Sequence, residues 1–208
     1  MIQEVNIEKE LRNSCWKDGG DVQKVRELLK YPEINVNGAD EGGWTPFIWA
    51  CLNGNLKIVE LLLNHDGVDV NKEDNYGQTA FSLACLNGNT EVVKLMLRYS
   101  HIDINLAEHE GWTPLMIAAA DERVDIIKWM IASGRKIEKK SKNIFRKTAL
   151  EISQEYNKTQ IVSILKGFEE NEEEIRKKLR IELNWECNFC FSSSFSSFFF
   201  KKKKSNIS

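Results

Sequence analysis

The sequence is poor in the residues that build metal sites, disulfide frameworks and β-rich folds. It has three Pro, three His and five Cys among 208 residues, and an odd number of Cys does not form a fully paired disulfide framework. Reduced thiols are typical of a cytoplasmic or nuclear protein, which is the localisation we expect. Runs of Val or Thr are few, so the composition favours helices over a β-sandwich.

The sequence also lacks long apolar runs and an excess of charge of one sign. No run of about 18 apolar residues is present, and the first residues do not resemble a signal peptide, so we expect neither a spanning helix nor secretion. The 29 basic and 31 acidic residues give a net charge of -2. We therefore expect no nucleic-acid partner, because no overall basic field attracts a polyanion.

Catalytic and metal-binding motifs are absent too. The chain has no Gly-rich phosphate loop, no His-Glu-x-x-His and no Gly-x-Ser-x-Gly. Cys187 and Cys190 form a single C-x-x-C, but a structural zinc site needs four ligands and no second pair accompanies them. We predict a protein that is not an enzyme, with no cofactor, no metal and no small-molecule substrate.

What the sequence does contain is an internal repeat. Thr45, Thr79, Thr113 and Thr148 are spaced by 34, 34 and 35 residues, and a Pro or Ala follows each of them. A second series has the same spacing and comprises Gly20, Gly54, Gly88, Glu122 and Asn157. Each of these residues is followed by an apolar segment with helical periodicity. Such periodicity is typical of a repeat solenoid.

Each repeat is predicted to be a helix, a turn and a second helix. Thr is a good N-cap, and Pro at the first helical position loses only an N–H that has no partner within the helix. The turn needs a residue in the left-handed region, where Gly is free of strain and Asn is tolerated. Glu122 is therefore expected to cost about 1 kcal/mol. Cys51 and Cys85 occupy equivalent helix positions, too far apart for a disulfide, and are expected to be buried.

These residues resemble the ankyrin repeat. The resemblance covers about residues 4–166 and rests on Gly-x-Thr-Pro, Ala-x-Leu-Asn-Gly-Asn and the apolar second helix. It implies an all-α ankyrin-repeat solenoid of about five stacked helix-turn-helix units, with projecting β-hairpin fingers. The fingers and first helices would form a concave face. The units are about one residue longer than the usual 33.

One departure from the family concerns the residue three positions after each Thr. The family has a His that joins helix to loop, and this chain has Ile48, Ser82, Met116 and Glu151. That hydrogen bond is therefore missing or replaced. A second family feature is the Asn that begins each finger, at positions 37, 71 and 105. We expect these Asn residues to hydrogen-bond the turn, and the resemblance makes them candidates for hydroxylation.

The predicted organisation follows the repeat and the change of composition after Asn184. Residues Glu169 to Leu183 are expected to form a closing helix that places Ile175, Leu179 and Leu183 on one face. The boundaries are 1–40 for an N-terminal capping unit, 41–74, 75–108 and 109–142 for repeats, 143–168 for a degenerate repeat, 169–184 for the capping helix and 185–208 for a low-complexity disordered tail.

On a solenoid without catalytic motifs, the surface is the candidate site. The residues between each finger tip and the next Thr, together with the ends of the first helices, are expected to bind a partner protein: Glu41, Trp44, Leu52, Asn53, Asn75, Tyr76, Gln78, Leu86, Asn87, His109, Glu110, Trp112, Asp121, Phe145 and Lys147. The aromatic residues among them are candidate anchors, because aromatic residues dominate many interfaces. The alternative is that the Trp before each Thr-Pro, which is common in ankyrin units, packs on its own finger.

The predicted function is that of a monomeric scaffold or adaptor, without catalysis, that binds a protein on its concave face. The first three fingers carry acidic residues and the last carries a basic stretch, which would orient a partner with oppositely charged ends. Two alternatives stay open. One is a membrane-localised adaptor that uses the Phe, Cys and Lys residues of the tail. The other is a substrate-recruiting subunit of an enzyme complex.

Overall fold

The computed structural model describes residues 7–16 and 19–185, and within these ranges the chain is helical. No strand forms there, and a single isolated bridge joins Glu73 and Thr79. The helices are α1 (Ile7–Trp16), α2 (Val22–Leu28), α3 (Pro46–Leu52), α4 (Leu56–Leu63), α5 (Ala80–Leu86), α6 (Thr90–Met96), α7 (Pro114–Ala120), α8 (Val124–Ala132), α9 (Ala149–Glu155), α10 (Thr159–Glu170) and α11 (Glu172–Glu182).

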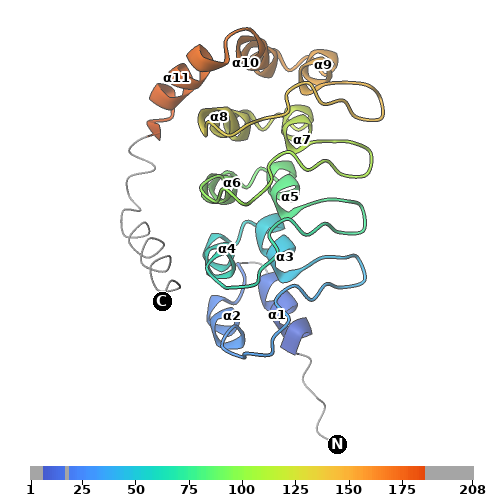
Figure 1. The fold of residues 1–208 in the computed structure, drawn as a ribbon, viewed down its shortest axis with the longest axis vertical. Helices are drawn as coiled ribbons and strands as arrows, with labels where there is room; N and C mark the ends of the chain where they lie inside the picture. Colours follow the sequence, from blue (N-terminus) through green and yellow to red (C-terminus); the bar gives the residue numbers. More distant parts are fainter. Residues whose placement is uncertain (1–6, 17–18, 186–208) are drawn as a thin grey trace, which may run out of the picture.

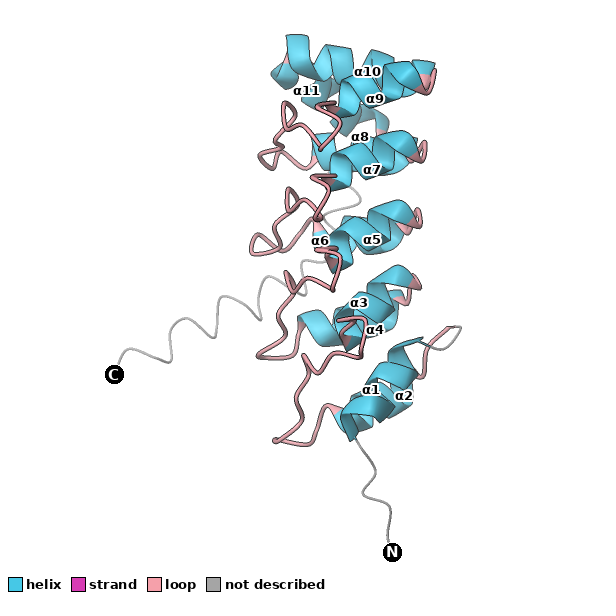
Figure 2. Ribbon diagram, turned by 90° about the vertical axis from the view of Figure 1, so that its right-hand side faces the viewer, coloured by secondary structure: helices cyan, strands magenta, loops and turns pink. Residues whose placement is uncertain are grey.

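Consecutive helices pair, and the pairs stack in one row (Figure 1). The odd-numbered helices α1 to α9 form one layer, in which each contacts the next, and the even-numbered helices α2 to α10 form the other. Four loops join the pairs and project to one side (Figure 2). We name them the first (29–45), second (64–79), third (97–113) and fourth (133–148) loops. These findings establish the predicted all-α repeat solenoid.

Threonine starts each first helix after α1. The Thr45 hydroxyl accepts a hydrogen bond from the N–H of Ile48 at 3.1 Å, and Pro46 follows at the first helical position. Thr79 and Thr148 form capping boxes, in which Ser82 and Glu151 bond back to the Thr N–H. The Thr148 N–H lowers the pKa of Glu151. The family His is thus replaced by another polar side chain in two repeats.

The turn inside each pair adopts the left-handed conformation. Gly54 and Gly88 have φ of 70° and 74°, and the equivalent Glu122 and Asn157 have 57° and 56°. Glu122 therefore occupies the strained region that the sequence predicted for it. Lys158 lies beside it, with its Nζ 2.6 Å from Glu122 Oε2. The fourth pair keeps the turn despite its unfavourable residue.

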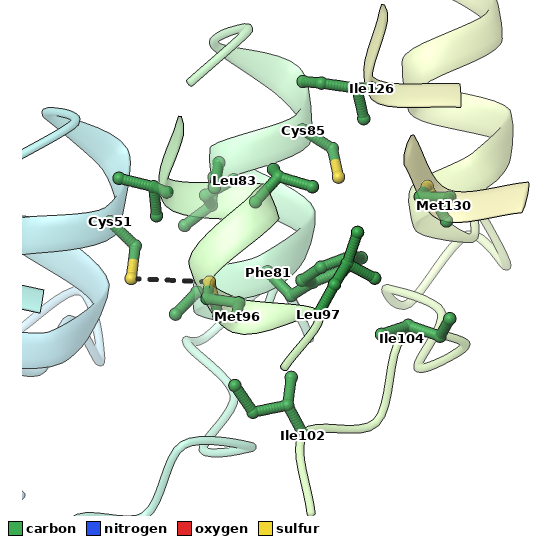
Figure 3. Packing of buried hydrophobic residues seen from close by; sticks show 14 of the residues in the cluster. Cys51, Phe81, Leu83, Cys85, Met96, Leu97, Ile102, Ile104, Ile126 and Met130 are labelled. Atoms are coloured by element: carbon green, nitrogen blue, oxygen red, sulfur yellow. Dashed lines mark hydrogen bonds between the residues drawn. The ribbon is translucent and has the colours of Figure 1, made fainter. Parts of the chain in front are cut away.

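The core runs between the layers and joins neighbouring pairs. Figure 3 shows Phe81 and Cys85 of α5 beside Met96 of α6, with Cys51 of α3 reaching the same cluster. The Cys51 Sγ lies 3.8 Å from the Met96 Sδ. Cys15, Cys51 and Cys85 are buried free thiols, as predicted for Cys51 and Cys85. Burial raises the pKa of Cys15 to about 12 and raises the pKa of the other two thiols as well.

Each loop ends in a tight turn, although β-hairpin fingers were expected and the loops contain no strand. In the second loop the N–H of Asp74 donates to the carbonyl of Gln78 at 2.9 Å, and the N–H of Gly77 donates to Asp74. Asp74 Oδ1 then accepts the N–H groups of Tyr76 and Gln78, each at 2.8 Å. Because the Asp74 side chain accepts these backbone N–H groups, they are not available for hydrogen bonds between two strands of a hairpin. Asp40, Glu108 and Asn143 do the same in the other loops.

The Asn side chains that begin the fingers bridge successive loops. Asn71 Nδ2 donates to the carbonyl of His101, and Asn71 Oδ1 accepts the N–H of Asp103, both at 2.8 Å. Asn37 and Asn105 repeat the pattern toward the second and fourth loops. We expected these side chains to serve their own turn, and that was wrong. Each side chain bonds instead to the backbone of the following repeat, where its N–H group donates to a carbonyl and its oxygen accepts an N–H.

The helix α11 lies against α8 and α10 (Figure 1). Its Arg176 and Arg180 donate to backbone carbonyls at the end of α8, with Arg180 Nε 2.8 Å from the oxygen of Ala132. These contacts satisfy carbonyls that a helix end leaves free. Leu179 is buried, and Ile175 and Leu183 are half-buried on the same side. The low-complexity tail predicted for residues 185–208 lies, beyond Trp185, outside the described residues.

We predict that Asn71→Ala lowers the free energy of unfolding by about 2 kcal/mol, because it removes two hydrogen bonds between loops and leaves their backbone partners without the amide. Asn64→Ala is the matched control, since Asn64 bonds only locally to the Glu60 carbonyl at 2.8 Å. Urea denaturation followed by circular dichroism measures both. Equal shifts for the two variants would contradict a bridging role for Asn71.

We predict that Glu122→Gly raises the free energy of unfolding by about 0.5 to 1 kcal/mol, because Gly is unstrained at positive φ. Loss of the exposed contact with Lys158 offsets only part of this gain. Lys158→Gln removes the same ion pair while keeping the strained residue, and it should be neutral or slightly destabilising. Thermal melts of both variants decide the point, and a lower melting temperature for Glu122→Gly would refute it.

Candidate functional site

A hollow of about 630 Å³ lies where the second and third loops pass the ends of α5, α7 and α9. It is formed by two loops and by the turns that end the first helices, so it spans several repeats. Its lining comprises Gln78, Leu86, Glu108, Glu110, Trp112, Ile117, Ala120, Asp121, Tyr156 and Lys158. The hollow is the candidate binding site.

The hollow has apolar surfaces and three carboxylates. Trp112 and Leu86 are half-buried, and Ile117 is buried beside them. Glu108, Glu110 and Asp121 supply the negative charge. This combination suits a partner side chain that has an apolar stem and a cationic end, since Lys and Arg have both.

The two cationic side chains in or beside the hollow, Lys158 and Arg123, already form contacts within the chain. Lys158, which lines it, has its Nζ 2.6 Å from Glu122 Oε2. Arg123, next to the hollow, donates through Nε and Nη2 to the Leu86 carbonyl, at 3.0 and 2.8 Å. The carboxylates therefore set the sign of the local field.

The loop that carries Trp112 is held in place before any partner arrives. Glu108 Oε1 accepts the N–H groups of Glu110 and Trp112, at 3.0 and 2.9 Å. The N–H of Gly111 also donates to the Glu108 carbonyl at 2.8 Å. Since these bonds fix the backbone, little ordering entropy is lost on binding.

The structure brings five of the predicted partner-binding residues into this hollow. Helix ends and loop residues far apart in sequence meet there because successive repeats stack in register. These five are Gln78, Leu86, Glu110, Trp112 and Asp121.

Trp44 and Leu52 lie nearer the first pair, outside the lining of the hollow. The Trp44 ring packs on Trp49, with centroids 4.4 Å apart, and both rings are half-buried. The indole N–H of Trp49 donates to Asp40 Oδ2 at 3.0 Å. Trp44 therefore contributes to the packing of its own repeat.

The predicted Asn residues each use their amide groups within the solenoid. Asn53 and Asn87 donate to the carbonyls of Trp16 and Leu52, both at 2.9 Å. Asn75 Nδ2 donates to the Glu41 carbonyl at 2.8 Å. These residues are exposed at the surface, and their amide N–H groups hold one repeat to the one before it.

The remaining predicted residues lie on the loops and form a row apart from the hollow. Glu41 and His109 are exposed, and Tyr76 and Phe145 have 65% and 60% of their surface accessible. Lys147 forms an ion pair with Glu155 of α9. The predicted residues thus divide between a hollow and a row of loop tips.

Ala120, which the resemblance also placed on the concave face, lines the hollow, whereas sequence reasoning missed Glu108, Ile117, Tyr156 and Lys158 as lining residues. Tyr156 occupies the same position of its repeat as Asn53, Asn87 and Asp121, all of which were predicted. The repeat alignment was therefore sufficient to find it. Lys158 is equivalent to Asn55, Asn89 and Arg123 of the other repeats. Nothing in the sequence indicated that the residue at this position contacts the hollow.

The described residues offer neither a metal-binding cluster nor a helix that could span a membrane. No group of three or more His, Cys, Asp or Glu residues there is placed to hold a metal ion. None of the helices described is both long enough and apolar enough to cross a membrane.

Comparison with known families matches ankyrin repeats in three copies, over residues 16–74, 67–143 and 103–178. The matched segments cover most of the chain and all of the residues that line the hollow. No curated protein matches the sequence. The chain belongs to the ankyrin-repeat family.

Proposed function

We propose that this chain binds a partner protein through the face that carries the hollow, and that it catalyses no reaction of its own. Ankyrin repeats are generally modules of protein–protein interaction and typically non-catalytic scaffolds. The observation that carries the proposal is the meeting of Trp112, Leu86 and Asp121 in one hollow between rigid loops and helix ends. Concave sites of this kind are where binding residues gather on a scaffold.

The proposed organisation has five ankyrin units, close to the boundaries predicted from sequence, except that α10 runs to Glu170 and so passes the predicted end of the fifth unit at residue 168. The helix pairs from α1–α2 to α9–α10 are the units, the four loops are the fingers, and α11 is the C-terminal cap. The contacts of Arg176 with the Ile131 carbonyl and of Arg180 with the Ala132 carbonyl support the capping role, because they cover the last backbone carbonyls of α8, against which α11 packs.

The partner is proposed to place a Lys or Arg side chain in the hollow. Its aliphatic stem would pack on Trp112 and Leu86, and its charged end would face Glu110 and Asp121. The other predicted residues, from Glu41 and Trp44 to Asn87, would extend this surface toward the first pair. A surface of that extent fits an interface of ordinary size.

We predict that Trp112→Ala and Glu110→Lys each weaken binding of the natural partner by about tenfold or more. The first removes the aromatic surface of the hollow, and the second reverses an exposed charge without touching the core. Affinity capture of wild type and both variants, followed by mass spectrometry and titration of the captured protein, measures the effect.

Ile181→Ser is the matched control, because Ile181 lies on α11 away from the hollow and 75% of its surface is exposed. It should bind the partner as wild type does. Circular dichroism must show all three variants folded, since Trp112 is half-buried and its loss also costs some stability. Equal capture by Trp112→Ala, Glu110→Lys and wild type would contradict the proposal.

A further inference from the structure

The tip of the fourth loop differs in chemistry from the three tips before it. Ile144 and Phe145 stand side by side in sequence, with 59% and 60% of their surface exposed. Lys140, Lys142 and Arg146 flank them and are exposed, with no ion pair to any described residue. The tip therefore presents two bulky apolar side chains among exposed cations.

Arg146 holds a backbone conformation that disfavours side chains. Its φ is 59°, whereas the equivalent Gly43, Gly77 and Gly111 of the other loops have φ of 84°, 79° and 79°. A charged residue thus stands at the one tip position where the earlier loops have glycine. Strain of this kind persists at sites where the side chain has a use.

The earlier glycines are required by the loop that follows each of them. A Cβ on Gly43 would lie 2.8 Å from the Asn75 nitrogen, and one on Gly77 would lie 3.0 Å from the His109 nitrogen. Among residues 19–185 no loop of this kind follows the fourth, because Asn171 alone separates α10 from α11. The space beside Arg146 is therefore the position that a further loop would fill, and Arg146 is exposed there with respect to the part of the chain that the structure describes.

The open edge also has a free backbone acceptor. The carbonyls of Gly42, Tyr76 and Glu110 accept the N–H of Asn75, His109 and Ile144, at 3.1, 3.0 and 2.9 Å. Phe145 is their equivalent in the fourth loop, and its carbonyl receives no such bond from the described residues. The row of bonds between loops thus ends in an unused acceptor.

The fourth tip has a neutral Asn at the position where the other three tips have a carboxylate. Asp40, Asp74 and Glu108 form the first three turns, and the neutral Asn143 forms the fourth with the same two backbone bonds. The turn residue of the fourth tip therefore brings no negative charge to the neighbouring cations, and the carboxylate that acts on Lys142 is Glu151 of α9. An acidic ligand complements this end of the row, and the acidic tips repel the same ligand elsewhere.

We propose that the open edge of the fourth loop, residues 142–147, binds an extended acidic segment of a partner protein. A backbone N–H of the segment donates to the Phe145 carbonyl, its apolar side chains pack on Ile144 and Phe145, and its carboxylates face Lys142 and Arg146. This edge lies outside the lining of the hollow, so it is a second binding site beyond the proposed function.

An extended segment fits this edge better than an anionic bilayer does. A free carbonyl is satisfied by the N–H of an added strand but is costly in lipid. The two sources of negative charge are separated by experiment.

The test uses the full chain and a short fluorescent peptide in which Glu and Leu alternate, with a Lys–Leu peptide as the control probe. We expect the acidic peptide to bind more tightly than the basic one, and its affinity to fall as salt rises. Arg146→Gly should weaken binding by about fivefold or more, and Phe145→Ser by about tenfold. Arg146→Gly should at the same time raise the melting temperature, because it relieves the strain at positive φ.

Glu122→Gly is the matched control, since it relieves the same strain at a distant turn and should leave peptide affinity unchanged. Trp112→Ala should also leave it unchanged, which separates this site from the hollow. Equal affinity of wild type and Arg146→Gly would overturn the proposal. So would binding to phosphatidylserine vesicles without binding to the peptide, because the occupant would then be a bilayer.

Discussion

The structure depends on the stacking of helix pairs that are too short to bury their own apolar faces. The helix α5 has seven residues, and all but Leu86 are buried, because α3 and α7 cover it on either side. The even-numbered layer is built in the same way. Each pair therefore derives stability from its neighbours, and the ends of the row need separate solutions. The helix α11 is one such solution, since it lies against α8 and α10 and its arginines satisfy carbonyls of α8.

Polar contacts between repeats fix how each helix pair is aligned with the next. Asn37, Asn71 and Asn105 bridge the loops, and Asn53 and Asn87 bridge the turns. Because each bond reaches about one repeat along the chain, it forms only when two pairs are correctly aligned. The same regularity makes the exceptions informative: the fourth loop has Arg146 and a free carbonyl where the others have glycine and a partner. The proposed second binding site thus lies where the repeat is interrupted.

The sequence was sufficient to predict the helical repeats, because their signals are local. Thr45 and its equivalents cap helices, and Glu122 takes the left-handed conformation that its position in the repeat demands. The side-chain bonds between loops were not predictable, since Asn71 meets partners some 30 residues away and its own turn offered a plausible alternative. The division of the predicted site into a hollow and a row of tips also needed the structure. The contribution of Lys158 to the hollow depends on how the repeats are rotated against each other.

Hydrogen exchange of the full chain, followed by mass spectrometry, tests most directly whether stacking is the source of stability. Phe81→Ala removes a fully buried ring from α5, the middle of the odd-numbered layer. If neighbouring pairs stabilise one another, amide protection falls in α3, α4, α7 and α8 as well as in α5 and α6. Loss of protection confined to α5 and α6, with the adjacent pairs unchanged, would show that each pair is stable by itself and would contradict the dependence on neighbours.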